Sequence, residues 1–286
     1  RQSKQWQWAL SLFFDLVDIW ATHVEPDVKC YNVAISACEI VGQWQHALSL
    51  MSGLRRISLK PDRFSYNAGI SACDKGGQWQ RALSILRHMC NSMLQVDVVA
   101  YNAGLSACAR AGRWQHARFL CCELKDAKLE PDIVSYGAAI SACTEEGLWQ
   151  QALSFLSEAT DCRIEPDLTA YNAVASACGT GKEWGYALFI LQDMQDAAVE
   201  PNVISFVAGI SACEKVGEWQ RALALLVESS GREVEANVVS FNSLISACGK
   251  GGQWRRALAL LSIMQGNTVE LDTISYNAGI SACEKC

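Results

Sequence analysis

The chain has 286 residues, half of them hydrophobic, with 24 Lys and Arg against 30 Asp and Glu, a net charge of −6 and 14 cysteines. No run of 18 apolar residues occurs, so no membrane-spanning helix is predicted. The acidic balance weighs mildly against a nucleic-acid partner, because a phosphate backbone attracts basic proteins. It does not decide the matter, since what counts is which face carries the charge.

The N-terminal segment 1–27 is the remnant of one repeat. Its QWQWALSL at Gln5–Leu12 matches QWQHALSL at Gln43–Leu50, and EPD closes it at Glu25–Asp27. It holds three more residues between those markers than the later copies, which predicts a longer second helix or loop. The chain begins without Met and stops within a repeat, so we interpret it as a fragment and infer nothing about targeting from its start.

Seven full repeats of 35 residues follow, and a half repeat, 273–286, ends the chain. The full repeats are 28–62, 63–97, 98–132, 133–167, 168–202, 203–237 and 238–272. Three landmark series keep this period: an aromatic residue at Tyr31, Tyr66, Tyr101, Tyr136, Tyr171, Phe206, Phe241 and Tyr276; a cysteine at Cys38, Cys73, Cys108, Cys143, Cys178, Cys213, Cys248 and Cys283; and a tryptophan at Trp44, Trp79, Trp114, Trp149, Trp184, Trp219 and Trp254. Such a period indicates a solenoid, propeller or array, and we predict a single solenoid domain.

Each repeat is predicted to form two helices. In the second copy, Tyr66, Ile70 and Cys73 recur at spacings of four and three, which is one face of a helix. Gly76-Gly77 interrupts this pattern, and Trp79 starts the same periodicity again. The first helix of each copy follows a favoured N-cap residue: Asp27, Asp62, Asp97, Asp132, Asp167, Asn202, Asn237 and Asp272. We therefore expect an all-α solenoid of stacked helical hairpins, with helices of about 13 and 13–15 residues.

The recurring cysteines and tryptophans are interpreted as structural. Equivalent cysteines on packed helices would lie about 8–10 Å apart, whereas a disulfide needs Cα atoms within about 7 Å. We expect reduced thiols that act as small apolar fillers in an intracellular protein. None of the four histidines falls at metal-ligand spacing with them, so no metal site is expected. The tryptophans could stack on bases, but their phase with the Ala and Leu of the second helix favours core packing.

A 35-residue helical hairpin with YN early in its first helix, a glycine turn, AL in its second and PD at its close resembles the pentatricopeptide repeat family. The resemblance covers residues 28–286. The Trp- and Cys-rich pattern ISACxKGGQW departs from the usual land-plant consensus, in which a leucine more often stands at the Trp position. The resemblance implies a right-handed superhelix whose concave groove holds single-stranded RNA, one base per repeat.

The resemblance also implies that the residue after the aromatic and the last residue of the repeat read the base. Uracil-type pairs are Asn32 with Asp62, Asn67 with Asp97, Asn102 with Asp132, and Asn242 with Asp272; Asn172 with Asn202 resembles the cytosine-type pair, and Asn277 holds the first of these positions in the half repeat. Gly137 with Asp167 and Val207 with Asn237 depart, because Gly and Val offer no side-chain hydrogen bond. The implied target, 5′ to 3′, is UUU-x-(C/U)-x-U.

Two further positions matter in the family. A mostly apolar residue at the second place of the repeat sandwiches the base: Phe64, Val99, Val134, Ile204, Val239 and Ile274, with Thr169 fitting less well and Lys29 departing. A basic residue near the end of the first helix meets phosphate: Lys75, Arg110, Lys215, Lys250 and Lys285, whereas Ile40, Glu145 and Thr180 depart. The repeat that holds both Gly137 and Glu145 is therefore expected to bind poorly.

Each of these roles has a structural alternative. An Asp or Asn at a repeat's end is worth about 1 kcal/mol as an N-cap, which is compatible with reading a base through the other oxygen. The Asn after the aromatic recurs in six of eight copies although Asn is a poor helix-interior residue. Its alternative role is a ladder of Asn side chains hydrogen-bonded to one another between repeats. The basic series could simply complement helix dipoles.

We interpret the chain as a sequence-reading single-stranded RNA-binding module of an organellar factor for RNA processing, stability or translation, in a mitochondrion or chloroplast. No Ser-His-Asp set, phosphate-binding glycine loop or HExxH occurs, so neither an enzyme nor a cofactor is expected. The alternative is a protein-interaction scaffold like the tetratricopeptide arrays, favoured by the acidic total and the two repeats without code residues. Scaffolds vary their groove residues freely, whereas Asn and Asp recur here, although recent duplication would also preserve them. A consensus-designed array fits less well, because the copies differ at many surface positions.

Overall fold

The computed structural model describes residues 7, 8, 11, 27–92, 94–232, 234–266 and 270–284. Regular structure in this part of the chain is helical throughout, without a strand. The helices are α2 (Val28–Val41), α3 (Trp44–Arg56), α4 (Arg63–Lys75), α5 (Trp79–Asn91), α6 (Val98–Arg110), α7 (Trp114–Asp126), α8 (Ile133–Ser141), α9 (Trp149–Asp161), α10 (Leu168–Thr180), α11 (Trp184–Asp196), α12 (Val203–Val216), α13 (Trp219–Gly231), α14 (Val238–Lys250), α15 (Trp254–Gly266) and α16 (Thr273–Glu284). Most of the predicted remnant 1–27, and Lys285, lie outside the described residues.

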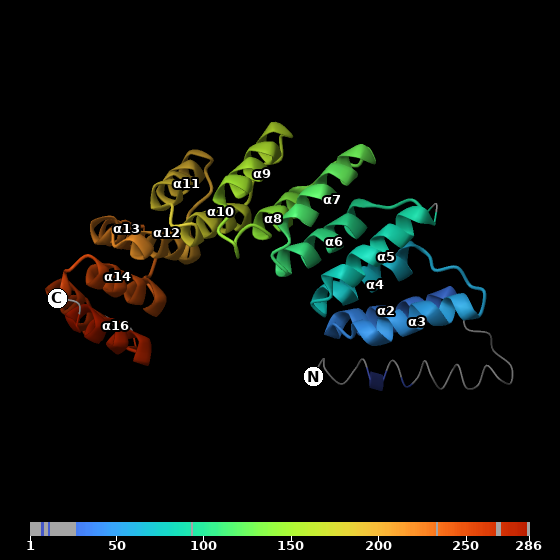
Figure 1. Cartoon of the computed structure of the whole chain (residues 1–286), viewed down its shortest axis with the longest axis horizontal. Coiled ribbons are helices and arrows are strands. Elements are labelled where there is room, and N and C mark those ends of the chain that lie inside the picture. Colours follow the sequence, from blue (N-terminus) through green and yellow to red (C-terminus); the bar gives the residue numbers. More distant parts are fainter. Residues whose placement is uncertain are drawn as a thin grey trace. The chain divides into compact units, whose positions relative to one another are not determined.

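The chain forms two compact units, residues 1–142 and 143–286. In the first unit, the first helices α2, α4, α6 and α8 pack in a row, and α3, α5 and α7 each pack between two of them (Figure 1). In the second unit, α10, α12, α14 and α16 form the row, with α11, α13 and α15 between them and α9 against α10. The predicted stacking of helical hairpins is thus confirmed within each unit, while the right-handed sense of the solenoid and its extent as a single domain stay predictions.

The first helices begin at the predicted N-caps. Each cap residue has an extended backbone and accepts a hydrogen bond from the backbone N–H three residues on, as at Asp27, Asp62, Asp97, Asp132, Asp167, Asn202 and Asn237. The turn into the second helix uses a left-handed residue, Gly77 at φ +69 in the second copy, a conformation that glycine adopts without a steric penalty. Local sequence therefore sets both ends of the first helix.

One first helix is shorter than predicted. α8 ends at Ser141 after 9 residues, where its counterparts run to 12–14. Glu145 and Glu146 stand where two other copies have Lys-Gly and a third has Lys-Val. Negative charge at a helix C-terminus opposes the helix dipole, so these residues disfavour a last helical turn.

The landmark aromatic and cysteine residues form the core between first and second helices in the seven full repeats, whereas Tyr276 of the half repeat is exposed. Tyr66, Ile70 and Cys73 are at most 2% exposed. Seven of the eight landmark cysteines are buried, and only Cys283, in the half repeat, is exposed. Burial raises the pKa of the Cys73 thiol to about 11, because a low-dielectric surrounding disfavours the thiolate. The predicted role as apolar fillers is confirmed for these seven.

The tryptophans correct a prediction, because six of them are half-buried, Trp254 is exposed, and none is part of the core. Five rings lie at the seam between repeats and meet the side chain two places after the next tryptophan: Trp44, Trp79, Trp149, Trp184 and Trp219. The Arg81 guanidinium lies 4.2 Å from the centre of the Trp44 ring, and Arg256 lies 3.8 Å from that of Trp219. The phase of a residue within its own helix does not reveal a partner 37 positions away. These five tryptophans therefore join neighbouring repeats, three of them through cation–π contacts with an arginine and two through ring contacts with His116 or Tyr186.

Within the described ranges, none of the helices combines the length and the apolar character needed to cross a membrane.

Candidate nucleic-acid interface

The two side chains predicted to read a base, called a reading pair below, are hydrogen-bonded to each other between neighbouring first helices. In the first unit, Asn32 Nδ2 donates to both Asp62 carboxylate oxygens, each at 3.0 Å. Asn102 donates to Asp132 at 3.0 and 3.1 Å. The contact arises because adjacent first helices pack together, which brings an Asn in the second turn of one helix to the N-cap of the next.

The remaining pairs form the same contact with small differences. Asn67 donates to Asp97 over longer distances of 3.3 and 3.4 Å. In the second unit, Asn172 Nδ2 lies 3.3 Å from Asn202 Oδ1, and Asn242 Nδ2 lies 3.1 Å from Asp272 Oδ1. Asn277 is exposed on α16. In all five complete pairs the two side chains are therefore hydrogen-bonded to each other.

These contacts decide between the structural alternatives for the two positions. The Asp and Asn residues do act as N-caps, as that alternative predicted. The predicted ladder of Asn side chains is corrected: in the described residues each Asn amide bonds the cap of the next helix, and only Asn172 and Asn202 form an amide–amide contact. The pKa of Asp272 lies below its usual range, chiefly because the backbone N–H of Ser275 donates to the carboxylate. This carboxylate is thus charged at neutral pH.

The two departing repeats lack the amide but keep the cap. No atom lies within 4 Å of the place that a Cβ on Gly137 would occupy, so its surface is open. Asp167 caps α10 through the N–H of Ala170 at 2.8 Å, and Asn237 caps α14 through Ser240 at 2.9 Å. Their last residues therefore serve the fold in the same way as in the other repeats.

The predicted base-sandwiching residues form a row of exposed apolar side chains in each unit. Their exposed fractions range from 52% at Val239 to 64% at Phe64. The row consists of Phe64, Val99 and Val134 in the first unit and of Ile204, Val239 and Ile274 in the second. Lys29 and Thr169, at the same place in their repeats, are also exposed. Apolar side chains repeated at one exposed position indicate a surface built to contact something apolar.

Three of the predicted phosphate contacts are engaged in ion pairs between repeats. Lys75 Nζ lies 3.2 Å from Glu39, Arg110 Nε 2.9 Å from Asp74, and Lys250 Nζ 3.2 Å from Glu214. A serine in the same repeat as the Lys or Arg also donates a hydrogen bond to each acidic side chain, as Ser246 does to Glu214 at 2.8 Å. The alternative role of these basic residues, complementing helix dipoles alone, therefore needs correction, because each Lys or Arg also pairs with an acidic side chain one repeat earlier.

Lys215 differs from these three. It is exposed and makes no ion pair with a described residue. The place 36 positions before it is Gly179, and the same place before Lys285 is Gly249. Two of the five basic positions thus have no acid at the corresponding place in the preceding repeat.

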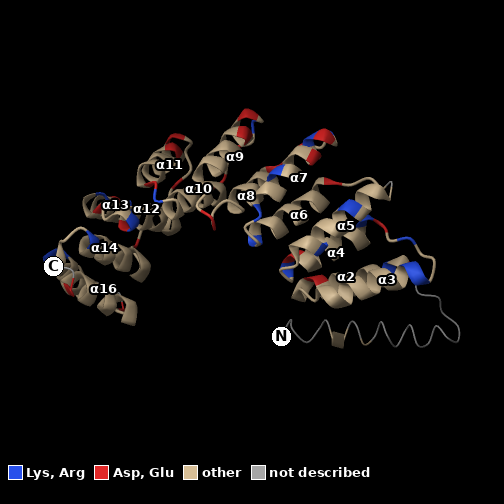
Figure 2. Ribbon diagram, viewed as in Figure 1, with Lys and Arg blue, Asp and Glu red and all other residues tan. Residues whose placement is uncertain are grey.

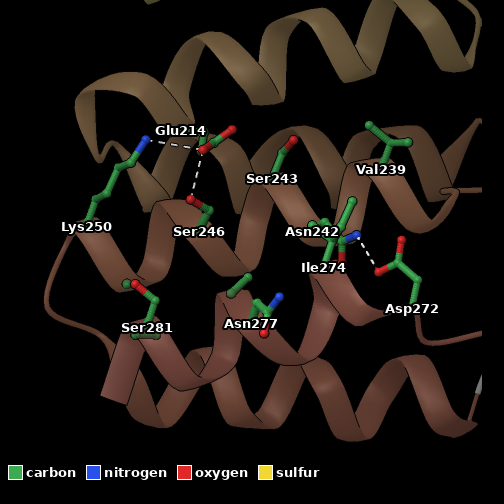
Figure 3. A pocket seen from close by; sticks show the side chains of 13 residues that line it. Glu214, Val239, Asn242, Ser243, Ser246, Lys250, Asp272, Ile274, Asn277 and Ser281 are labelled. Atoms are coloured by element: carbon green, nitrogen blue, oxygen red, sulfur yellow. Dashed lines mark hydrogen bonds and ion pairs between the residues drawn. The ribbon is translucent and has the colours of Figure 1, made fainter. Parts of the chain in front are cut away.

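All three predicted classes of residue line one groove in the second unit. This groove, of about 490 Å³, lies along α12, α14 and α16. Its lining includes Asn242, Asp272 and Asn277, the apolar Val239 and Ile274, and Lys250. Figure 3 shows these side chains on the same side of the helices, with Asn242 joined to Asp272 and Lys250 to Glu214. A polar reading pair, an apolar platform and a cation are therefore brought together in one concave site.

Much of the acidic charge lies on the second helices, away from the asparagines of the reading pairs. Figure 2 shows Asp and Glu gathered at the C-terminal ends of the second helices α7, α9 and α11. These ends include Asp126, Asp161 and Asp196. The asparagines of the reading pairs lie on the first helices, so the net charge of −6 does not describe their surface. In the described part of the chain, no three His, Cys, Asp or Glu side chains are grouped to hold a metal ion.

Sequence reasoning missed a serine at the third place of several repeats. Ser65, Ser135 and Ser205 are fully buried, and each hydroxyl contacts both members of a reading pair. The available signal was the spacing of the serine three places after an N-cap Asp or Asn, which is typical of a capping box.

Comparisons with known proteins support the repeat architecture. A family model described as "Pentatricopeptide repeat domain" matches residues 16–75, 84–146, 119–181, 154–215 and 189–251, and one described as "PPR repeat family" matches 236–285. No curated protein matches the chain.

Solved structures share the fold. The pentatricopeptide repeat protein PPR10 from maize is 21% identical with a TM-score of 0.61, over 94% of this chain and 43% of that one. PPR10 in complex with an 18-nucleotide psaJ RNA element is 18% identical with a TM-score of 0.59, over 94% and 44%. The PPR domain of Arabidopsis thaliana protein-only RNase P 1, in complex with tRNA, is 17% identical with a TM-score of 0.53, over 65% and 95%. The chain therefore spans less than half the length of PPR10.

Proposed function

Because the chain belongs to the pentatricopeptide repeat family, we propose that it is a sequence-reading single-stranded RNA-binding module that acts by occupying an organellar transcript and not by chemistry. The complexes of PPR10 with a psaJ RNA element and of the RNase P domain with tRNA support RNA as the ligand. The action of the whole protein on its transcript, and its mitochondrial or chloroplast location, are part of the same proposal.

The groove of Figure 3 is the observation that carries this proposal. A single-stranded base offers an apolar face and a polar edge at once. Val239 and Ile274 are exposed apolar side chains from neighbouring repeats, and the Asn242–Asp272 pair lies between their helices. A base that entered between the two apolar side chains would meet the polar pair with its Watson–Crick edge.

The polar pair has the hydrogen-bonding capacity to select a pyrimidine. After the bond to Asp272, the amide of Asn242 has a second N–H left, and the carboxylate has further lone pairs. Uracil presents a carbonyl acceptor beside an N3–H donor, which complements an amide donor beside a carboxylate acceptor. In the repeat of Asn172, the amide of Asn202 replaces the carboxylate and offers a donor, which suits the N3 acceptor of cytosine. The proposed target is UUU-x-(C/U)-x-U.

One observation favours the second candidate, a protein-interaction scaffold. Lys75, Arg110 and Lys250 are already neutralised by acids in the free protein, which reduces the attraction for phosphate. A peptide partner would not need that charge. The following experiment separates the two functions.

Fluorescence anisotropy is measured with labelled UUUACAU and its purine-exchanged partner GGGACAG at about 150 mM salt. The variant replaces Asn32, Asn102 and Asn242 by Ala, which removes three reading amides and leaves every N-cap in place. Asn91→Ala is the matched control, because Asn91 is exposed at the end of the second helix α5. We expect binding to UUUACAU alone, retained in the control and weakened by about two- to tenfold for each amide in the variant. Equal binding of both RNAs would leave only phosphate attraction, and no binding to either would favour the scaffold.

A further inference from the structure

The buried serine at the third place of a repeat connects the two reading side chains. Ser135 Oγ lies 2.6 Å from Asn102 Oδ1 and 2.9 Å from Asp132 Oδ1. A hydroxyl has one proton to donate, and the shorter distance assigns that proton to the Asn oxygen. The hydroxyl oxygen in turn accepts from the backbone N–H of Asp132 at 3.2 Å.

This arrangement fixes both ends of the Asn102 amide. The NH₂ end faces a carboxylate, which only accepts, and the oxygen end faces a hydroxyl that donates. An amide held at both ends cannot exchange its nitrogen and oxygen by rotation without losing both bonds. The same geometry recurs at Asn32 with Ser65 at 2.5 Å and at Asn172 with Ser205 at 2.6 Å.

One reading pair of the same unit, Asn67 with Asp97, is not followed by a serine at the third place of the next repeat. Asn67 and Asp97 are followed by Ala100. Asn67 Oδ1 is buried and has no hydrogen-bond partner in the described chain, and its amide lies 3.3–3.4 Å from Asp97, against 3.0–3.1 Å at Asn102. The amide of Asn67 is thus held at one end only.

In one repeat the serine hydroxyl bonds the cap residue and not the Asn oxygen. Ser275 Oγ donates to Asp272 Oδ1 at 2.8 Å, and Asn242 Oδ1 is left buried without a partner. A serine therefore allows the Asn amide to be held at both ends, an arrangement called the clamp here, and the clamp is closed only where the serine oxygen lies within hydrogen-bond distance of the Asn oxygen, as at Ser135.

We propose that Ser65, Ser135 and Ser205 are positioning residues, each of which determines how strictly the reading pair of the preceding repeat discriminates between bases. This inference rests on the proposed RNA-reading function. A clamped amide always presents its free N–H to the groove, so a base with a donor at that place is rejected. An amide held at one end, as at Asn67, can turn its oxygen outward and accept such a base at less cost.

The chain offers a matched exchange experiment, because the Asn67–Asp97 pair is followed by Ala100 and the Asn102–Asp132 pair by Ser135 at the third place of the next repeat. Binding of Ser135→Ala and Ala100→Ser is measured against UUUACAU and a set of RNAs with each uracil changed in turn to cytosine, which carries an amino donor where uracil carries its O4. We expect Ser135→Ala to lower discrimination at one uracil by about three- to tenfold and Ala100→Ser to raise it at the neighbouring uracil by a similar factor. Ser135→Thr, which keeps the hydroxyl, should retain wild-type discrimination.

A weaker cap would reduce the affinity for all RNAs alike, so equal losses for matched and mismatched RNA in Ser135→Ala would overturn the proposal. A second readout needs no RNA: the side-chain NH₂ signals of Asn102 in ¹⁵N-resolved NMR spectra. Ser135→Ala should shift these signals and speed their exchange with water. If the signals change and discrimination does not, the serine serves the fold alone and the inference is wrong. If the wild type binds no RNA while the signals respond as expected, the RNA-reading function fails and the clamp itself is confirmed.

Discussion

Gly251 and Trp219 are expected to depend on each other, and substituting Gly251 by Ala tests this directly. Gly251 follows α14 with φ −85, a conformation open to alanine. A Cβ at this place would fall inside van der Waals contact of the Trp219 ring and 3.1 Å from the Gly217 carbonyl oxygen. The ring has little freedom to move, because the Arg256 guanidinium lies 3.8 Å from its centre.

The expected magnitude follows from two opposing terms. Crowding a packed site costs about 1–3 kcal/mol, and replacing glycine by alanine at a permitted conformation stabilises by about 0.4–1 kcal/mol through the unfolded state. The net expectation for Gly251→Ala is a loss of about 0.5–2 kcal/mol in the free energy of unfolding. When Trp219→Ala has removed the ring, the same change should be neutral or stabilising, which gives a coupling energy of about 1–3 kcal/mol.

The assay is urea unfolding of the parent, both single variants and the double variant, followed by circular dichroism. Gly231→Ala is the matched control, since Gly231 ends α13 and no atom lies within 4 Å of its added Cβ; we expect a small stabilisation. The reasoning is refuted if Gly251→Ala lowers the unfolding midpoint equally in the presence and absence of Trp219. It is also refuted if Gly251→Ala stabilises the protein as the control does.

Three further predictions concern charge and burial. Burial raises the pKa of the Cys108 thiol to about 12, so this thiol should react slowly in a disulfide-exchange assay at pH 8. Cys122 is exposed, and Cys122→Ser should therefore remove one fast-reacting thiol, whereas Cys108→Ser should leave the number of fast-reacting thiols unchanged. Burial also raises the pKa of the Asp74 carboxyl, and the nearby Arg110 opposes this shift. The folded state therefore favours the protonated acid, so the free energy of unfolding falls as pH rises through that pKa. In urea titrations, Asp74→Asn should be at least as stable as the parent at pH 7, and the difference in stability between the two should shrink toward pH 4. A larger loss at pH 7 than at pH 4 would show that the ion pair dominates. Finally, because only two of the five basic positions lack an acid one repeat earlier, the slope of log Kd against log salt for UUUACAU should be about 1.4, and a slope near 3.5 would mean that all five release counterions.

The sequence predicted those features that depend on neighbours along the chain. Asp62 is a strong N-cap whatever surrounds it, and the breaks at Gly76-Gly77 end a helix locally, so helix starts and the hairpin could be placed. Burial of Cys73 followed from its phase with Tyr66. The period of 35 then carried each assignment through seven copies.

Features that depend on the neighbouring repeat were beyond this reasoning. The partner of Lys75 is 36 residues earlier, and that of Trp44 is 37 residues later. Such contacts are fixed by how one hairpin is set against the next, which the periodicity within a hairpin does not specify. The half-buried state of Trp44 has the same origin, because its ring closes a seam and fills no core. A comparison of charges across the copies would have revealed an acidic residue 36 positions before three of the five Lys or Arg residues.

In the proposed RNA-reading function, the last residue of each repeat both caps a helix and contacts the base, and this double role restricts which residue types can stand there. Asp132 Oδ1 caps α8 through Ser135 N–H at 2.8 Å, while both of its carboxylate oxygens receive the Asn102 amide. The cap and the Asn102 amide together hold the carboxylate in one position, and such preorganisation would reduce the cost of binding a base. Only Asp, Asn, Ser and Thr cap well through a side-chain oxygen, so a residue that read a base better but could not cap would cost about 1 kcal/mol per repeat. The restriction to Asp and Asn at this place therefore follows from helix capping as well as from base reading, and variety in base preference must come chiefly from the other member of the pair, as at Gly137 and Val207.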